Sequence, residues 1–250
     1  MEHEEYQRMF ALEDRHWWFQ GRLMMIERLL RRHVLPVLPA RPRLLDLGCG
    51  TGLFLQRRLR ECEPFGIDFS VEALACCRTR VPGRLARADA ARLPFADAVF
   101  DVVSAFDLIE HVADDVALVA EAWRVLRPGG CFIATVPAHP ILWSAHDVSL
   151  HHQRRYRRAQ FNALFNAAPW ETIRMTAGFT LIFPPALLIR LGRRLARSSR
   201  PPVSDTRETA EWLNRLLIRL HAGEAAWLER HDLPIGISLM TIRRKPEARP

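Results

Sequence analysis

Lysine is almost absent from this sequence. Lys245 is the single lysine among 36 basic residues, so arginine carries nearly all of the positive charge. The formal net charge is +8, and such a charge would suit a nucleic acid or an anionic membrane as a partner. An arginine-rich composition spread over ordinary solvated faces accounts for the charge without any such partner, and we favour that interpretation.

Long hydrophobic runs are missing as well. A membrane-spanning helix needs ~20 consecutive apolar residues, whereas the most apolar stretch, FTLIFPPALLI, is short and is interrupted by Pro184 and Pro185. The first ten residues are acidic and mixed rather than basic and then apolar, so we expect no secretory signal. These absences predict a soluble, cytoplasmic protein.

Cysteine is sparse and lacks the spacing of metal ligands. The five cysteines are an odd number, and we expect them to be reduced thiols. No other ligand cluster is visible in the sequence, so we expect no metal site. The cysteines are Cys49, Cys62, Cys76, Cys77 and Cys131.

What the sequence does contain is an alternation of short apolar runs with helical patterns. Such alternation is typical of strands and helices arranged around a parallel sheet. The most regular helix starts at Asp114 or Asp115 and stops at Pro128. Further helices are predicted at 22–35, from residue 185 onward and at 206–230. The runs predicted as strands are RLLDL, PFGIDF, RLARAD, VFDVVSAF, GCFIATVP, WETIRMTAGFTLIF and PIGISLMTIRR.

A glycine-rich stretch, RLLDLGCGTG, includes the first of these runs. Gly48, Gly50 and Gly52 let the backbone turn tightly and approach a ligand closely. A dinucleotide fingerprint would need glycine or alanine where the chain has Leu53, so the spacing argues against a nicotinamide enzyme. Asp68 lies 20 residues after Gly48, where a carboxylate can accept from both hydroxyls of a ribose. The implied ligand is an adenosine without a pyrophosphate.

Several motifs together resemble the class I S-adenosylmethionine-dependent methyltransferases. DLGCGTG is similar to the first motif of that family, GIDFS to its second, ADAARLPFADAVFDVV to its third, and VLRPGG to its turn into strand five. The resemblance implies an α/β fold of Rossmann-like type: a mostly parallel seven-stranded sheet in the order 3-2-1-4-5-7-6, with an antiparallel last strand and helices on both faces. It also implies S-adenosylmethionine as the cofactor.

The same resemblance implies roles at the cofactor site. Gly48 and Gly50 would lie against the methionine part, Asp68 would hold the ribose, and Asp89 would accept the adenine amine beside the backbone N–H of Ala90. The stretch HWWFQGR resembles a subfamily motif whose aromatic residues would cover the cofactor while its arginine meets the cofactor carboxylate, although packing on the sheet explains the aromatic residues almost as well. The full predicted set is Asp46, Gly48, Gly50, Gly52, Asp68, Phe69, Asp89, Ala90, Phe106, Trp18 and Arg22.

The segment after the fifth run, from His139 to Tyr156, is dense in ionisable residues and resembles the subfamily motif H-D-x-x-L-x-H-x-R-R-Y. Methyl transfer from a sulfonium needs an acceptor held at near-attack distance, and a base when a proton must leave. His146 or His152, oriented by Asp147, could be that base. The alternative is a structural network that pairs Asp147 with an arginine and fastens the loop, and for any single residue we favour the network.

We expect a small-molecule or lipid-like acceptor. Enzymes that methylate base amines carry Asn or Asp, Pro, Pro and an aromatic residue after the fourth strand, whereas this chain has FDLI, and no RNA-binding module is visible. We therefore do not expect a nucleic acid as substrate. A nucleic-acid methyltransferase and a cofactor-binding protein without turnover remain the alternatives, and the sequence leaves the oligomeric state open.

Three parts of the chain are predicted. Residues 1–42 form an amino-terminal helical cap, residues 43–183 and 232–246 the cofactor-binding core, and residues 184–231 a helical insertion. Within the insertion, a stripe of leucines flanked by arginines could lie on an anionic membrane, or could be buried on the domain or in a dimer, which we favour. The leucines are Leu188, Leu191 and Leu195, and the arginines are Arg190, Arg193, Arg194 and Arg197.

Overall fold

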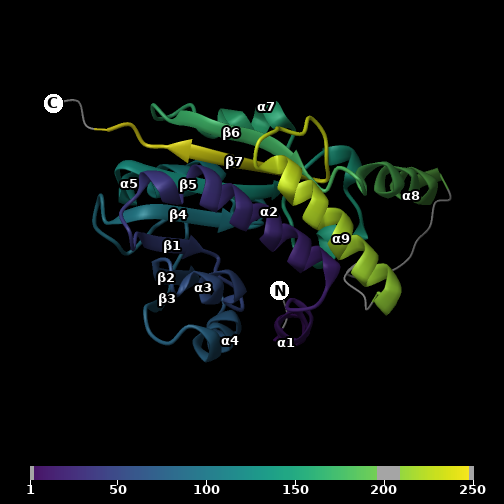
Figure 1. Ribbon diagram of the computed structural model, residues 1–250, viewed down its shortest axis with the longest axis horizontal. Coiled ribbons are helices and arrows are strands. Elements are labelled where there is room, and N and C mark those ends of the chain that lie inside the picture. The colour runs from purple at the N-terminus through teal and green to yellow at the C-terminus, as the bar shows by residue number, and fades with distance from the viewer. Residues whose placement is uncertain (1–2, 196–208, 248–250) are drawn as a thin grey trace.

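A seven-stranded sheet forms the centre of the molecule (Figure 1). The computed structural model describes residues 3–195 and 209–247. Within these residues the strands are ordered β3-β2-β1-β4-β5-β7-β6, and β7 runs antiparallel to both of its neighbours. This order and orientation confirm the predicted fold. The strands are β1 Arg43–Leu47, β2 Glu63–Asp68, β3 Leu85–Arg87, β4 Phe100–Phe106, β5 Leu126–Pro137, β6 Glu171–Gly178 and β7 Ser238–Arg244.

Helices cover both faces of this sheet. Neighbouring residues on the central strands enter different cores, because strand side chains alternate between the two faces. Leu44 and Val102 belong to a core shared with α2, α3, α4 and α9, while Leu45 and Val103 belong to a core shared with α5 and α7. The α-helices are α1 His3–Leu12, α2 Trp17–His33, α3 Leu53–Arg58, α4 Val71–Arg80, α5 Asp115–Val125, α6 Ala145–Ser149, α7 Arg158–Ala163, α8 Phe183–Leu195 and α9 Glu211–Leu228, with short 3₁₀ helices η1 Leu35–Val37, η2 Ile109–His111 and η3 Pro140–Leu142.

Capping side chains mark where several helices begin. Asp114 accepts a hydrogen bond from the N–H of Ala117 at 2.8 Å, so the predicted helix at α5 starts at the expected acidic pair. His16 accepts from the N–H of Trp18 at 3.3 Å. Helix α2 therefore begins at Trp17, earlier than the predicted residue 22.

Two predicted boundaries are wrong where the chain leaves β6. The strand predicted over 170–183 ends at Gly178, because Phe179 adopts φ +59° and turns the chain out of the sheet. Helix α8 begins at Phe183 rather than at Pro185, with both prolines in its first turn, where N–H groups have no intrahelical partner. The remainder of the predicted basic helix, with Arg197, lies outside the described residues.

Helices α2 and α9 pack side by side over the β7 side of the sheet, whereas α8 extends at one end of the molecule (Figure 1). Among the described helices, none combines the length and the hydropathy needed to cross a bilayer.

Candidate functional site

A cleft of about 1320 Å³ opens at the carboxyl ends of the parallel strands. This edge is where doubly wound sheets bind their ligands. Its walls come from the glycine turn after β1, from η2 after β4, from the 146–155 segment and from residues of α1 and α8. Gly52 and Asp147 are not part of the lining. The predicted site residues that line the cleft are Asp46, Gly48, Gly50, Asp68, Phe69, Asp89, Ala90, Phe106, Trp18, Arg22, His146 and His152.

The glycines of the first turn differ in what surrounds them. All three have positive φ, which disfavours any side chain. A Cβ added at Gly48 would lie 2.7 Å from Leu108, and one at Gly52 would lie 2.5 Å from the Sγ of Cys77, so these two allow close packing within the protein. At Gly50 the nearest atom would be Met9 Cε at 3.6 Å, which leaves open space beside the cleft. Gly52 thus shapes the turn without facing the cleft.

Asp68 ends β2 and is tied to the glycine turn. Its carboxylate accepts from the N–H of Gly50 and from the N–H of Ser70, each at 2.9 Å. Burial raises the pKa of Asp68, and these backbone donors oppose the shift. Each carboxylate oxygen has two lone pairs, so the side chain retains acceptor capacity toward the cleft.

Asp89 and Phe69 lie farther along the same wall. The Asp89 carboxylate accepts from the N–H of Ala91 at 2.8 Å, which orients it after β3. Phe69 leaves 70% of its surface exposed, and the guanidinium of Arg87 lies 5.0 Å from its ring centroid. An exposed aromatic ring on the wall of a cleft offers a ligand an apolar face.

Asp46 is the buried carboxyl behind the glycine turn. Burial raises its pKa to about 7, and the hydroxyl of Ser104, which donates to it at 2.6 Å, opposes that shift. Its proton occupancy therefore changes close to neutral pH, unlike that of an ordinary surface aspartate.

Arg22 and the tryptophans of HWWFQGR occupy the wall formed by α2. Arg22 forms an ion pair with Asp107, which follows β4 and also accepts from the hydroxyl of Thr135 at 2.9 Å. Trp18 stacks on Phe179 with ring centroids 4.2 Å apart, and Trp17 stacks on His221. The aromatic residues therefore both pack within the protein and border the cleft, and the Arg22–Asp107 pair was not anticipated from the sequence.

Glu13, a buried acidic residue directly after α1, contacts the glycine turn. Glu13 accepts hydrogen bonds from Thr51 in the turn and from Arg80 in α4. Burial raises the pKa of Glu13, and the bonds from Thr51 and Arg80 oppose this. No sequence pattern predicts this contact, because Glu13 lies in a mixed charged stretch typical of a solvated surface.

The 139–156 segment is held by hydrogen bonds to its neighbours. Asp147 is fully buried inside α6 and forms a capping box with Ser144, accepting from Ser144 N–H at 2.9 Å. It also accepts from Arg155 Nε at 2.6 Å and from His152 Nδ1 at 3.0 Å. Burial alone would raise the pKa of Asp147, but the bond from His152 and the Arg155 guanidinium hold it well below its usual range. The predicted pairing of Asp147 with an arginine is present, while His146 and His152 border the cleft.

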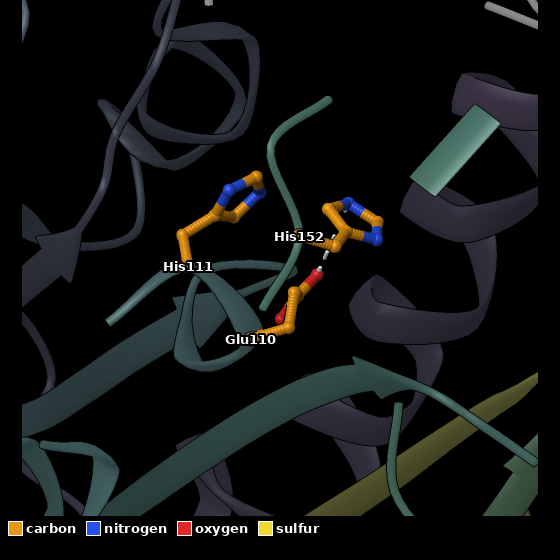
Figure 2. Close-up of side chains that lie close together, drawn as sticks. All are labelled: Glu110, His111 and His152. Carbon is orange, nitrogen blue, oxygen red and sulfur yellow. Dashed lines mark ion pairs between the residues drawn. The ribbon is translucent and has the colours of Figure 1, made fainter. Parts of the chain in front are cut away.

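The structure also brings together three side chains that the sequence did not group. Glu110 and His111 of η2 meet His152, and their potential ligand atoms all lie within 4.8 Å of one another (Figure 2). Burial raises the pKa of Glu110 well above its ordinary value, and burial together with the neighbouring His152 lowers the pKa of His111 to about 4. The sequence contained only the adjacent Glu110–His111 pair, which could equally be a structural cap.

Comparison with known proteins places the chain in a family. The family described as "Methyltransferase domain" matches residues 45–134. A probable S-adenosylmethionine-dependent methyltransferase of Mycolicibacterium smegmatis is 31% identical over 170 residues, which are 64% of this chain and 62% of that protein. A demethylmenaquinone methyltransferase of Beutenbergia cavernae is 30% identical over 208 residues, covering 81% of this chain and 73% of that protein.

Among solved structures, the complex of the Haloferax volcanii Trm112 methyltransferase activator with a methyltransferase contains a chain of the same fold. It matches with a TM-score of 0.60 and 20% identity, over 99% of this chain and 96% of that one. The chain belongs to the class I S-adenosylmethionine-dependent methyltransferases, whose cofactor is S-adenosylmethionine. It spans less than two thirds of the length of the Mycolicibacterium relative.

Proposed function

We propose that this protein transfers the methyl group of S-adenosylmethionine to a small-molecule or lipid-like acceptor. The observation that carries the proposal is the cleft, which the glycine turn and Asp68 line together with histidines of the 146–155 segment. Its volume of about 1320 Å³ exceeds the ~300–1,000 Å³ typical of single-ligand pockets. A cofactor and an acceptor can therefore occupy it together.

The residue roles in this proposal follow the family resemblance. Asp68 binds the ribose, Asp89 and Ala90 the adenine, and the backbone at Gly48 and Gly50 the methionine part. The remaining side chains predicted for the cofactor line the same cleft, and Gly52 acts through the turn. The motifs HWWFQGR and HDVSLHHQRRY support assignment to a subfamily within the family. The remaining cofactor residues of the proposal are Asp46, Phe69, Phe106, Trp18 and Arg22.

The first experiment separates turnover from binding alone. S-adenosylhomocysteine is titrated calorimetrically into the full chain. Its formation from S-adenosylmethionine is then measured with a phenol, an amine, a carboxylic acid and reduced demethylmenaquinone as candidate acceptors. We expect S-adenosylhomocysteine to bind, and to be formed with at least one of these acceptors. Binding without product formation with any acceptor would favour the cofactor-binding protein. Product formation with an RNA or DNA oligonucleotide alone would favour the nucleic-acid methyltransferase.

The histidines facing the cleft are proposed to serve the acceptor rather than the cofactor. We expect His146→Ala and His152→Ala to lower turnover by roughly 100-fold, as loss of a general base does, with little change in S-adenosylhomocysteine affinity. His231→Ala is the matched control, because that histidine is exposed and stacks on Trp227 at the end of α9. Variants that melt early but keep full turnover per folded molecule would instead establish the structural network around Asp147.

In place of the burial on the domain or in a dimer that the sequence favoured, we also propose that the 184–231 insertion brings the protein to an anionic lipid surface that carries the acceptor. Apolar residues on α8 and α9 are exposed, and on α9 they recur at i, i+4 and i+8, which places them on one face. Residues of α8 also border the cleft. Relatives of the chain include proteins named demethylmenaquinone methyltransferases, whose name indicates a lipid-like acceptor. The exposed residues are Leu188, Ile189, Leu191, Trp212, Leu216 and Leu220.

Vesicle sedimentation tests the lipid contact. We expect the protein to sediment with anionic vesicles at low salt and to be released as salt rises, because screening shortens to ~8 Å near physiological ionic strength. The double variant Leu188→Ser, Trp212→Ser should sediment less, while Val37→Ser, at an exposed residue of η1, is the control. Absence of sedimentation even at low salt would leave a soluble acceptor, with the apolar residues serving a dimer or a lid.

A further inference from the structure

Glu110, on the cleft wall, has an unusual environment for a carboxylate. Its side chain has no exposed surface, and neither carboxylate oxygen has a hydrogen-bond partner among the described residues. Buried polar groups are nearly always partnered, because an unpaired one loses its hydration without compensation. Glu110 is also one of the residues that line the cleft, so a partner bound on that side would lie close to its carboxylate.

His152 is oriented toward this carboxylate. Its Nδ1 lies 3.0 Å from the buried carboxylate of Asp147, while its Nε2 lies 4.0 Å from Oε1 of Glu110 (Figure 2). A carboxylate at Nδ1 holds the N–H there and leaves the lone pair on Nε2, which is the arrangement found behind histidines that bind metals. Arg155 pairs with Asp147 and balances its charge.

The two loops that carry these residues are held against each other. The N–H of Gln153 donates to the carbonyl of Glu110 at 2.9 Å, and the Gln153 side chain donates to the carbonyl of His111 at 2.7 Å. Arg154 adds a bond to the carbonyl of Ala113 at 3.0 Å. The backbone therefore brings His152 beside η2 through contacts that do not involve the three side chains themselves.

We propose that Glu110, His111 and His152 bind one divalent transition-metal ion. This inference rests on the proposed function, because the open coordination positions would face the cleft and take a hydroxyl oxygen of the acceptor as its oxyanion, with the proton leaving to solvent. His152 would then serve the acceptor as a metal ligand instead of as a general base. Two imidazole nitrogens and one carboxylate oxygen suit Zn²⁺ or Fe²⁺ better than Mg²⁺ or Ca²⁺, which prefer oxygen ligands. This proposal departs from the expectation drawn from the sequence that no metal is bound.

The geometry allows such an ion with small side-chain movements. Bonds of about 2.0–2.1 Å place the ligand atoms of a tetrahedral zinc site roughly 3.3 Å apart. His152 Nε2 and Glu110 Oε1 are 4.0 Å apart, so this pair needs to close by less than about 1 Å. All three ligand atoms lie within 4.8 Å of one another, so the other pairs need to close by at most about 1.5 Å.

Calorimetric titration of Zn²⁺ into the chelator-treated full chain tests the site. We expect one tightly bound ion per chain in the wild type and in the His231→Gln control. Glu110→Gln keeps the shape of the side chain. The single variants Glu110→Gln and His111→Gln should each weaken zinc binding on the order of 100-fold or more, since even loss of a partner that only orients a ligand costs about 10–100-fold. Circular dichroism verifies that each variant is folded. No tight ion in the wild type, or equal affinity in folded Glu110→Gln, would overturn the metal site.

The same proteins separate this inference from the proposed function. S-adenosylhomocysteine should bind the metal-free wild type and Glu110→Gln equally, because the cofactor residues are unchanged. Cofactor binding without zinc binding would refute the metal site alone, whereas zinc binding without cofactor binding would refute the proposed function. Catechol is the probe for the acceptor position, and we expect it to bind at least tenfold more tightly with zinc present. Equal catechol affinity with and without zinc would refute the proposal that the acceptor binds the metal ion.

Discussion

Replacing Gly50 by valine is expected to weaken S-adenosylhomocysteine binding by more than 100-fold. Gly50 has φ +53°, and a left-handed conformation costs a side-chain-bearing residue roughly 1–2 kcal/mol. The valine methyl groups would also enter the open space beside the cleft, where only Met9 lies within 4 Å of an added Cβ. Any backbone movement that relieves the strain would weaken the bond from the Gly50 N–H to Asp68.

Gly83→Val is the matched control for Gly50→Val. Gly83 has φ +79°, so valine there carries comparable backbone strain, yet no atom lies within 4 Å of its added Cβ and the residue does not line the cleft. Calorimetry with S-adenosylhomocysteine should show near wild-type affinity for this control, and thermal unfolding should show similar destabilisation of both variants. If both variants lose affinity to the same extent, strain in the fold rather than intrusion into the cleft is responsible.

Asp68→Ala is expected to weaken S-adenosylhomocysteine binding by roughly 10- to 150-fold, because losing a charge-assisted hydrogen bond costs about 1.5–3 kcal/mol. The substitution removes the acceptor proposed for the ribose and leaves the N–H groups of Gly50 and Ser70 without their partner. Asp68→Asn, which retains one carbonyl oxygen, should fall between the wild type and alanine.

An exposed carboxylate provides the comparison for Asp68. Asp97 pairs with Arg124 at 2.7 Å, but its side chain is 77% exposed, and such surface pairs contribute only about 0–1 kcal/mol to stability. Asp97→Ala should leave calorimetric affinity for S-adenosylhomocysteine unchanged. An Asp68→Ala variant that is folded and binds as tightly as the wild type would show that the ribose is held elsewhere.

Much of the fold could be predicted because its signals are local. Asp114 caps α5 where the acidic pair indicated a helix start, and glycines with positive φ follow β1 where the repeated glycines indicated a turn. The strand order came from the family resemblance rather than from periodicity, and the observed sheet confirms it. Boundaries were less predictable near β6, because Phe179 leaves the sheet through a backbone conformation that residue type does not reveal.

In the candidate site, too, some positions could be predicted from the sequence and others depend on packing. The positions of Gly50 and Asp68 follow from the sequence, since Gly50 lies in the turn after β1, Asp68 ends β2, and the carboxyl ends of parallel strands share one edge. Their roles toward the cofactor remain predictions. The proximity of Arg22 to Asp107 and of Glu13 to Thr51 depends on how α2 and α1 pack on the sheet, which no local pattern encodes.

What the sequence determined by itself was therefore the class of fold, the glycine turn and the strand-end carboxylates, because these depend on backbone preferences within a few residues. Only the tertiary structure decided that Asp147 is buried behind His152, and that Glu110 and His111 share a cluster with His152. The physical reason is that burial and proximity across loops arise from packing between distant segments. A histidine or glutamate in sequence looks the same whether water or another side chain surrounds it.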